Sequence, residues 1–342
     1  MVERLLITGG TGFFGRALLR HFHSEATSSA SGQPHNFDEV IVLSRNPEAF
    51  ANRYPALASA PWLLWVRGDV CQPQTLDALL VGETVSAVLH AATDSTDAAA
   101  LSPIDKLDQI VDGTRNVLQL AVRLRARRFL MTSSGGVYGP QPAEMEQIPE
   151  TYCGMPDPLQ VSSTYGLGKR MAEHLCHLYA QSYGLETVIA RCFAFVGQDL
   201  PLDAHFAIGN FIRDALHKPS IEVGGDGTPV RSYMDQRDLS RWLLALLERG
   251  RAGHAYNVGS DAAITIRDLA YLVMDTLAPG KPVSIAVKIS AQSFRNRYVP
   301  SISKARTELG LTLEYSLEDS IRESASGFRD GVASSQAARS RR

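Results

Sequence analysis

Tyr165 and Lys169 are the residues whose types and spacing most clearly indicate chemistry. They lie four residues apart in a segment with helical periodicity, and a helix would place both side chains on one face. A lysine ammonium beside a phenol favours the phenolate, so we expect Lys169 to lower the tyrosine pKa from its ordinary value of ~10. Such a tyrosine can give a proton to a carbonyl oxygen or take one from a hydroxyl.

Ser134 is the third member of this candidate catalytic group. It follows the predicted strand 128–132, at the carboxyl end where parallel sheets bind their ligands. Its hydroxyl could polarise the oxygen on which the tyrosine acts, and we assign this role to Ser134 rather than to Ser133. A nicotinamide laid across the same edge would supply or accept a hydride, so the group predicts a nicotinamide-dependent oxidoreductase.

A glycine-rich turn follows the first predicted strand and opens a helix. Gly9, Gly12 and Gly15 allow a tight turn, a close approach of the backbone to a pyrophosphate and close packing of the helix on the sheet. The helix N-terminus then offers free N–H groups to the phosphates. We therefore predict that this turn, with Phe13 and Phe14, binds NAD(P).

The end of the second predicted strand, 40–43, bears on the choice of cofactor. An acidic residue there would bind the adenosine ribose, whereas an arginine accepts a 2′-phosphate. The strand is followed by Ser44 and Arg45 without a carboxylate, so NADP(H) is favoured and NAD(H) is the alternative. In the other interpretation Arg45 stacks on the adenine or faces solvent. Asp69 and Val70, after the third strand, are expected beside the adenine from topology alone.

Short apolar runs alternate with helical segments through the first part of the chain. This alternation predicts the α/β class, with a Rossmann-type doubly wound parallel sheet covered by helices on both faces. The polar stretch 24–37 is expected to be a surface insertion. Amphipathic helices are predicted at 107–125 and 165–183. Buried strands are predicted at 4–8, 40–43, 62–67, 87–89, 128–132 and 187–191.

After Gly197 the pattern changes to short strands, loops and separate helices, which predicts a smaller lobe over the carboxyl edge of the sheet. The residues from 325 to 342 are polar, small and basic, and we expect them to be disordered. The predicted domains are a dinucleotide-binding domain of residues 1–197 with about 227–258, and a smaller α/β lobe of residues 198–226 and 259–324.

Composition excludes several classes of function. The 342-residue chain is 44% hydrophobic with a net charge of −2, which lacks the basic excess of a nucleic-acid binder. No apolar run is long enough to predict a membrane span, and the first residues lack the order of a secretory signal. The four cysteines have no zinc-site spacing, so we expect free thiols, a cytoplasmic location and no metal site.

These features together resemble the extended short-chain dehydrogenase/reductase family, in its NAD(P)-dependent nucleotide-sugar epimerase/dehydratase branch. The matching segments span nearly the whole chain in family order, and they are specific to the family more than to a reaction. They are TGGTGFFG at 8–15, GDV at 68–70, HAAT at 90–93, GTRNVL at 113–118, SSGGVYG at 133–139, YGLGK at 165–169, RCFAFVG at 191–197, GDGTPVRSYMDQRDL at 225–239 and YNVGS at 256–260.

The resemblance implies a Rossmann domain that holds the cofactor and a C-terminal lobe that holds a nucleoside diphosphate sugar. It implies that Tyr165 is the acid/base, that Lys169 also holds the nicotinamide ribose, and that Ser134 binds the reacting oxygen. Members similar to this chain often form homodimers through a four-helix bundle, which here would use 107–125 and 165–183. Further cofactor contacts are implied at Ala91, Ala92 and Thr93, and further substrate contacts at Gly135, Asn210, Arg231 and Arg297.

Two arginines are candidates for binding the diphosphate. Arg231 falls where the family places such a residue, which suits a guanidinium because its fork matches phosphate oxygens. For Arg297, a second contact of this kind and a surface salt bridge remain as alternatives.

Departures from the family pattern bear on the reaction. Dehydratases similar to this chain carry an Asp-Glu pair directly after the catalytic hydroxyl residue, and decarboxylases carry a Glu at the second position; here the two positions are Gly135 and Gly136. We therefore expect no 4,6-dehydratase activity. Ala194 replaces a substrate-binding Asn, and Ile110 stands where an Asn is often found. Substrate binding is thus expected to differ from that of the well-known epimerases.

Reversible hydride transfer at a sugar carbon, C4 in our expectation, is the chemistry that remains. An epimerase would oxidise the carbon and reduce it again from the other face, whereas a keto-reductase would take NADPH from solution and reduce a 4-keto sugar once. The other hypotheses are a reductase of a non-sugar carbonyl compound and a non-catalytic NAD(P)-binding module. The expected partners are a nucleoside diphosphate sugar and a second copy of the chain, without nucleic acid or membrane.

Overall fold

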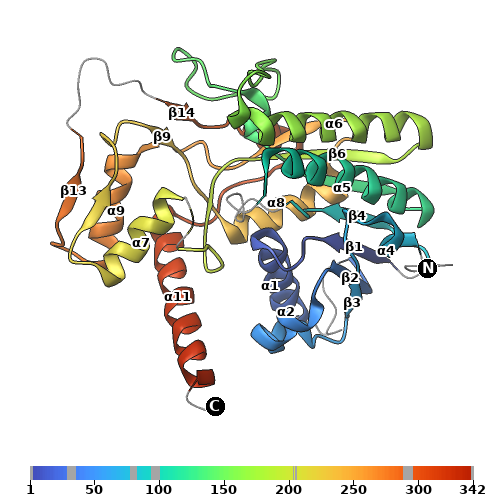
Figure 1. Cartoon of the computed structure of the whole chain (residues 1–342), viewed down its shortest axis with the longest axis horizontal. Coiled ribbons are helices and arrows are strands. Elements are labelled where there is room, and N and C mark those ends of the chain that lie inside the picture. The colour runs from blue at the N-terminus through green and yellow to red at the C-terminus, as the bar shows by residue number, and fades with distance from the viewer. Residues whose placement is uncertain are drawn as a thin grey trace.

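A parallel sheet of seven strands forms the centre of the molecule (Figure 1). The computed structural model describes residues 3–28, 36–77, 83–93, 101–202, 204, 206–287 and 296–339. The strands are β1 (Arg4–Thr8), β2 (Glu39–Ser44), β3 (Leu63–Arg67), β4 (Ala87–His90), β5 (Arg128–Ser134), β6 (Glu186–Cys192) and β11 (Ala255–Val258). They lie in the order β11-β6-β5-β4-β1-β2-β3. The predicted doubly wound α/β fold is confirmed.

The apolar runs form strands because helices cover both faces of this sheet. In β1, Leu5 and Ile7 belong to one buried cluster and Leu6 to another, as expected when successive side chains point to opposite faces. All three are at most 1% exposed. A strand buried on both faces needs apolar residues at every position, which explains the unbroken run.

Four long helices make the two covering layers. α1 (Phe13–Ser28) and α8 (Gln236–Arg249) pack on one face, and α5 (Pro103–Arg123) and α6 (Thr164–Tyr183) pack on the other (Figure 1). The Ser102 hydroxyl caps α5 by accepting the N–H of Asp105, and Gly184 ends α6 in the left-handed conformation. Short helices join the strands: α2 (Pro47–Arg53), α3 (Pro55–Ala58), α4 (Pro73–Asp77), η1 (Gly135–Tyr138) and η2 (Val161–Ser163).

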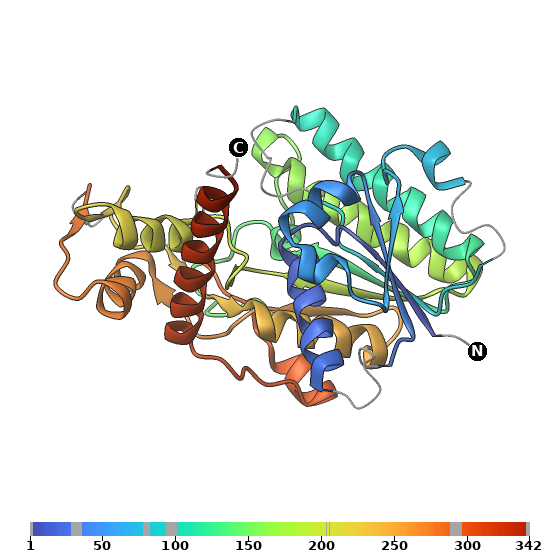
Figure 2. The same cartoon turned by 90° about the horizontal axis from the view of Figure 1, so that it is seen from below.

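A smaller lobe with its own buried cluster lies to one side of the sheet in both views (Figures 1 and 2). Its short strand β14 pairs in parallel with β9, and β9 pairs with β12. The elements of the second half of the chain are β7 (Phe195–Val196), α7 (Ala207–His217), β8 (Ile221–Val223), β9 (Val230–Arg231), β10 (Met234–Asp235), β12 (Ile264–Thr265), α9 (Ile266–Leu277), β13 (Val283–Ile285), β14 (Arg297–Tyr298), α10 (Ser303–Leu309) and α11 (Leu317–Arg339).

The disorder predicted for residues 325–342 is wrong for 325–339, which belong to α11, while 340–342 lie outside the described residues. Tertiary contacts explain the difference. The hydroxyl of Ser324 donates to the carbonyl of Gly197 at 2.8 Å. The ring of Phe328 lies 5.3 Å from that of His217. A polar sequence is helical here because its first turns pack on the smaller lobe.

The surface insertion predicted at 24–37 is shorter than expected, since α1 continues to Ser28. Residues 29–35 lie outside the described part of the chain. Within the described residues, none of the helices combines the length and apolar character needed to cross a bilayer.

One buried carboxylate connects the sheet domain to the segment that leads into the smaller lobe. Asp199 lies between β7 and α7, and its side chain is 3% exposed. Arg16 and Arg20 of α1 pair with it at 3.1 and 2.8 Å. Gln236, which begins α8, donates to it at 3.1 Å and accepts its backbone N–H at 2.9 Å. The two helices of one layer are thereby tied to the start of the smaller lobe.

Candidate active site

Ser134 and Tyr165 meet at the carboxyl edge of the sheet. Ser134 is the last residue of β5 and is 9% exposed, while Tyr165 lies in the first turn of α6. The Ser134 hydroxyl accepts the backbone N–H of Gly136 at 3.0 Å, and a side-chain carbon at Gly136 would lie 3.3 Å from this hydroxyl and 3.9 Å from the Tyr165 ring. The structure therefore brings together two of the three predicted catalytic residues.

Ser133 is occupied elsewhere. Its hydroxyl donates to the Glu173 carboxylate at 2.5 Å, and Glu173 also binds Arg191 at 2.8 Å. A serine held by a buried ion pair is not free to bind a substrate oxygen. This geometry supports the choice of Ser134 over Ser133.

Lys169 is 2% exposed and lies one helical turn after Tyr165. Its ammonium donates to the hydroxyl of Thr93 and to the carbonyl of Thr132, both at 2.8 Å. It lies 5.9 Å from the centre of the Tyr165 ring. Burial lowers the pKa of Lys169 to about 8, because the charged form loses its hydration.

The expected lowering of the Tyr165 pKa by Lys169 is wrong for the chain without a bound cofactor. Burial raises the pKa of Tyr165 to about 12, and the hydrogen bond from Ser134 opposes this rise only in part. Desolvation of the half-buried ring is the larger effect, and Lys169 directs its hydrogen bonds to Thr93 and the Thr132 carbonyl. Tyr165 is thus fully protonated at neutral pH and suited to act as an acid.

The glycine turn has the geometry that a dinucleotide requires. Gly9 has φ +77°, and a side-chain carbon there would lie 2.4 Å from the carbonyl oxygen of Ala91. At Gly15 such a carbon would lie 2.2 Å from Gly10, so α1 packs closely on the turn. At Gly12 it would meet only the carbonyl oxygen of Gly9, at 3.4 Å. Space therefore lies in front of Gly12, beside the N-terminus of α1, as a phosphate would need.

The remaining predicted cofactor residues lie along the same edge. Phe13 and Phe14 open α1, and their rings lie 6.5 and 5.1 Å from that of Phe195. The backbone N–H of Ala91 bonds to the carbonyl of Thr8, which places Ala91, Ala92 and Thr93 directly beside β1. These residues fit a dinucleotide that runs from the glycine turn towards Lys169.

The end of β2 carries the residues predicted to select the cofactor. Ser44 is buried and its hydroxyl accepts the N–H of Asn46, while Arg45 is exposed. Arg67 of β3 donates to the backbone carbonyl of Arg45 at 3.1 Å. Asp69 is half-buried and accepts the N–H of Cys71; Val70 is buried, and its carbonyl accepts from Asn116.

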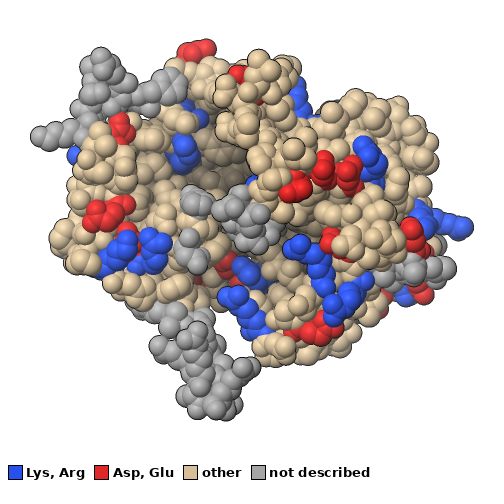
Figure 3. Space-filling view, in the orientation of Figure 1, with Lys and Arg blue, Asp and Glu red and all other residues tan. Residues whose placement is uncertain are grey.

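The predicted substrate residues come from the smaller lobe and occupy different surroundings. Arg231 of β9 donates to the carbonyls of Val230 and Asn296, and burial lowers its pKa. Arg297 of β14 donates to the carbonyl of Glu146 at 3.3 Å. Asn210 lies on α7 and accepts from Arg213 at 3.0 Å. Figure 3 shows a recess between the two lobes with basic side chains beside it.

The family model described as "NAD dependent epimerase/dehydratase family" matches residues 5–259. The chain belongs to this family. The resemblance inferred from the motifs is therefore confirmed.

Known members differ in the reaction that they catalyse. UDP-glucuronic acid decarboxylase 1 from Arabidopsis thaliana is 32% identical over 330 residues, which cover 96% of this chain and 70% of that protein. DesIV, a dTDP-glucose 4,6-dehydratase from Streptomyces venezuelae solved with NAD, is 27% identical with a TM-score of 0.77, covering 96% of this chain and 97% of that one. RMD from Pseudomonas aeruginosa, solved with NADPH, is 25% identical with a TM-score of 0.75, covering 96% and 99%.

Three residues at the site of this family member were not predicted from the sequence. The hydroxyl of Tyr298 on β14 lies beside Gly135, since a side-chain carbon there would be 2.6 Å from it. The ring of Phe193 lies 4.6 Å from the ring of Tyr298. The ammonium of Lys106 on α5 lies 5.4 Å from the centre of the Tyr165 ring. Each of these residues stands alone on its element and carries no spacing signal, so only the fold brings them to the site.

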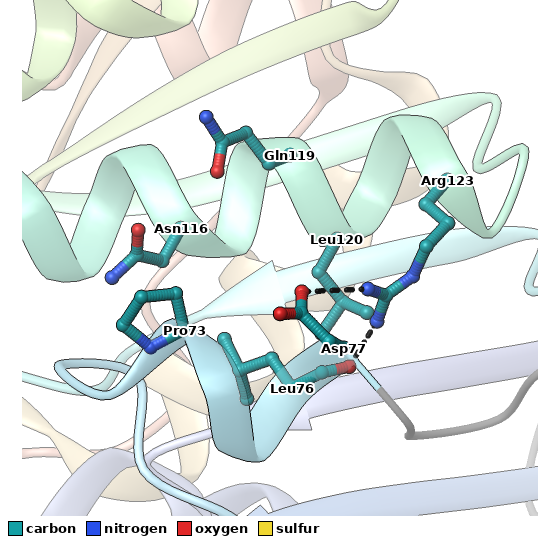
Figure 4. Close-up of a pocket in the computed structure, with 7 residues that line it drawn as sticks. All are labelled: Pro73, Leu76, Asp77, Asn116, Gln119, Leu120 and Arg123. Carbon is teal, nitrogen blue, oxygen red and sulfur yellow. Dashed lines mark hydrogen bonds and ion pairs between the residues drawn. The ribbon is translucent and has the colours of Figure 1, made fainter.

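A separate shallow pocket of this epimerase/dehydratase family member lies between α4 and α5 (Figure 4). Arg123 closes one side by binding Asp77 and the carbonyl of Leu76. None of the residues that line it belongs to the predicted cofactor or substrate site: Pro73, Leu76, Asp77, Asn116, Gln119, Leu120 and Arg123.

Proposed function

We propose that this protein is an NAD(P)-dependent reductase of a nucleotide-activated 4-keto sugar. The observation that carries the proposal is the placement of Ser134, Tyr165 and Lys169 at the carboxyl edge of the sheet, followed by two glycines in place of carboxylates. These residues retain hydride chemistry and lack a side-chain acid or base for elimination.

The chain's own residues divide the reductive step between them. A bound NADPH would supply the hydride. Tyr165 holds its proton at neutral pH, because burial raises its pKa to about 12, and gives that proton to the oxygen of the sugar ketone. Ser134 hydrogen-bonds the same oxygen and stabilises the charge that develops on it. Lys169 would hold the nicotinamide ribose beside them. The ketone gains a hydride and a proton and becomes an alcohol.

Elimination and decarboxylation are the reactions that we propose are lost. Some relatives are decarboxylases and dehydratases, which by the family pattern use carboxylates after the hydroxyl residue. Here η1 begins with Gly135 and Gly136. A side-chain carbon at Gly136 would point at the Ser134 hydroxyl, 3.3 Å away, so a carboxylate at this position would reach the reacting groups. Its absence leaves no base there to take a proton from C5.

An epimerase is the second candidate. It would use the same three residues in both directions. Tyr165 would first take the proton of the C4 hydroxyl and later return a proton to the C4 oxygen, while a bound cofactor would accept the hydride of C4 and return it to the opposite face of the sugar. The family description favours it. The end of β2, with Arg45 and no carboxylate, favours the reductase instead, because it suits NADP(H), and NADPH is the usual cellular reductant.

One assay separates these reactions. The chain would be incubated with NADPH and 4-keto-6-deoxy sugars carrying UDP, dTDP or GDP, and with the corresponding 4-hydroxy nucleotide sugars. Stoichiometric loss of NADPH absorbance with a keto sugar supports the reductase. Interconversion of the 4-hydroxy isomers without net loss of NADPH indicates an epimerase. Release of CO₂ or formation of a 4-keto product from a hydroxy sugar would refute the proposal.

The Tyr165→Phe variant tests the role of the phenol. We expect turnover to fall by at least about a hundredfold, since the proton donor is removed, while NADPH binding measured by fluorescence stays unchanged. Unchanged turnover would refute the mechanism. Turnover of simple aldehydes or ketones in preference to every nucleotide sugar would favour a non-sugar substrate, and NADPH binding without any turnover would favour a binding module.

We also propose that NADP(H) is preferred over NAD(H). The exposed Arg45 directly after β2, with Arg67 bound to its carbonyl, provides positive charge where the adenosine ribose would lie. In Arg45→Ala the Kd for NADPH should rise roughly tenfold, about 1.4 kcal/mol, while the Kd for NADH stays the same. Equal changes in the Kd values of both cofactors would show that Arg45 does not bind the 2′-phosphate.

A further inference from the structure

A third residue follows the catalytic tyrosine and lysine on the same side of α6. Tyr165, Lys169 and Glu173 are spaced at four-residue intervals, so the helix places them in one row. Lys169 donates to the Thr132 carbonyl of β5 at 2.8 Å. The hydroxyl of the next residue, Ser133, donates to the Glu173 carboxylate at 2.5 Å. The row is therefore bonded at two consecutive residues to the strand that ends in the catalytic serine.

Arg191 of β6 binds the Glu173 carboxylate from the neighbouring strand. It is the partner of Ser133 in the register of β5 and β6. Its Nε lies 3.1 Å from one carboxylate oxygen and its Nη2 lies 2.8 Å from the other, which is the two-pronged geometry of a strong pair. The side chains of Glu173 and Arg191 are only 12% and 18% exposed. Glu173 thus accepts hydrogen bonds from both strands at one level of the sheet.

The remaining nitrogen of Arg191 reaches the turn that follows Ser134. Its Nη1 donates to the Tyr138 hydroxyl at 2.9 Å. A guanidinium can only donate, so this hydroxyl accepts from Arg191 and gives its own proton to Asn257 Oδ1 at 2.8 Å. Tyr138 is 1% exposed and ends η1, which begins at Gly135. The ion pair is therefore bonded to the chain both before and after the catalytic serine.

The turn between these two bonded residues has little support of its own. The Ser134 hydroxyl accepts the backbone N–H of Gly136 at 3.0 Å, so its orientation follows the backbone of the turn. Two consecutive glycines, Gly135 and Gly136, come next, and glycine has more conformational freedom than any other residue. The place of the Ser134 hydroxyl thus depends on how firmly Ser133 and Tyr138 are held.

We propose that Glu173 is a positioning residue of the active site, which through its ion pair with Arg191 holds the chain on both sides of Ser134. The inference rests on the proposed reductase function and deepens it. Both carboxylate oxygens of Glu173 are bonded within the protein. Glu173 therefore acts through the serine hydroxyl and not on the substrate itself.

Glu173 also supplies negative charge beside Lys169. Burial raises the pKa of Cys192 to about 12, raises that of Cys176 as well, and lowers that of His90 to about 3. These groups are uncharged at neutral pH, as is Tyr165, so the Glu173 carboxylate is the charge that stabilises the Lys169 ammonium. In the described part of the chain, the titratable groups that face this ammonium from α6, β6 and β4 are Tyr165, Glu173, Cys176, Cys192 and His90.

Glu173→Gln keeps the shape of the side chain and removes its charge. We expect the plateau kcat with NADPH and a 4-keto-6-deoxy nucleotide sugar to fall roughly ten- to a hundredfold, because the Ser134 donor is misplaced, while the KM of the sugar changes less than about threefold. The alkaline limb of the kcat profile should move to lower pH, because the pKa of Lys169 falls below about 8 once the carboxylate is gone. Glu173→Asp retains the charge and should return this limb to its native position.

Glu186→Gln is the matched control. Glu186 pairs with Arg128 at 2.9 Å at the amino ends of the same two strands, at the opposite edge of the sheet from the site. This variant should leave kcat and the pH profile unchanged. A native pH profile in Glu173→Gln, or equal losses of kcat in the two variants, would overturn the positioning role. Melting temperatures show that the variants are folded.

Tyr138→Phe removes one of the two bonds to the turn and leaves the ion pair intact. Here kcat should fall about three- to tenfold while the alkaline limb stays at its native pH, since no charge has changed. A native kcat in this variant would count against the positioning role even if Glu173→Gln did not fold.

A measurement without substrate separates this inference from the proposed function. Backbone amide exchange of residues 133–139 is followed by mass spectrometry in the native chain, in Glu173→Gln and in Glu186→Gln. Exchange in this segment should be at least about threefold faster in Glu173→Gln and native in Glu186→Gln, because only the first variant releases the turn. That result supports the positioning role even if no keto sugar is reduced. Native exchange in Glu173→Gln would refute it, whatever the substrate.

Discussion

His90 is a buried histidine that connects three elements at the residue scale. Its Nδ1 lies 2.7 Å from the Thr8 hydroxyl at the end of β1, and its Nε2 lies 3.1 Å from the Thr114 hydroxyl of α5. Thr114 donates its own proton to the carbonyl of Ile110 at 2.6 Å, so it accepts from Nε2–H. Nδ1 then accepts from Thr8. The neutral ring thereby holds the strand that leads into the glycine turn.

Protonation of His90 should limit stability in acid. Burial, with a smaller contribution from Lys169, lowers the pKa of His90 from 6.5 to about 3. Above the pKa of this histidine in the unfolded chain, both states are neutral and no stability is lost. Below that pKa the unfolded state takes up the proton first, so the free energy of unfolding falls as the pH falls towards the pKa of the folded state. Between about pH 7 and about pH 5 this group should lower the free energy of unfolding by about 2 kcal/mol.

Urea unfolding of the native chain and of His90→Gln at these two pH values measures the effect. The glutamine keeps a polar group beside both threonines and does not titrate, so its loss of stability should be smaller by about 2 kcal/mol. Identical losses in the two proteins would mean that the folded state already binds the proton at His90.

Asp199 acts at the scale of elements, because it pairs with two arginines of α1 and with the first residue of α8. A buried carboxylate of this kind is costly to remove. Its partners remain half-enclosed and lose the charge that compensates them. The relation of α1 and α8 to the segment that enters the smaller lobe thus depends on one side chain.

Asp199→Ala should lower the free energy of unfolding by about 3 kcal/mol, because it leaves Arg16 and Arg20 without their shared carboxylate. The exposed pair of Asp77 and Arg123, with Asp77 76% exposed, is the control. Asp77→Ala should change stability by less than about 0.5 kcal/mol. Urea unfolding followed by circular dichroism compares the two. Losses of similar size would mean that the Asp199 cluster contributes no more than a surface ion pair.

At the scale of the whole molecule, α5 and α6 present apolar side chains to solvent. Ile104 is 72% exposed and Leu107 38% on α5, and Met171 is 51% and Leu178 45% exposed on α6. Met171 and Leu178 are two turns apart and share a face. Apolar residues clustered on two adjacent helices indicate an interaction surface, and a two-fold axis would pair them with the same helices of a second copy.

We predict a homodimer through these helices. Sedimentation of the native chain should give twice the mass of one chain, and Met171→Glu with Leu178→Glu should give a single chain, because charges cannot be buried unpaired in the interface. Tyr271→Glu, on α9 of the smaller lobe with Tyr271 39% exposed, is the control and should remain dimeric. A native chain that sediments as a monomer at micromolar concentration would contradict the prediction.

Local patterns in the sequence were sufficient for six strands of the sheet, for the covering helices α1, α5 and α6, and for the Tyr165–Lys169 pair. Buried parallel strands need unbroken apolar runs, and helical spacing places residues four apart on one face. Both patterns can therefore be recognised within short segments of the sequence. The glycine turn is similar in its spacing, which lies within the first βα unit, although the contact that excludes a side chain at Gly9 is with Ala91 after β4.

Only the tertiary structure decided the state of Tyr165, the occupant of the space above Gly135 and the order of residues 325–339. The pKa of Tyr165 depends on how deeply its hydroxyl is enclosed by other elements. Tyr298 comes from a strand of the smaller lobe, and α11 is held by Gly197 and His217. Contacts between residues far apart in the chain leave no local pattern, because the desolvation and packing that produce them exist only once the fold has formed.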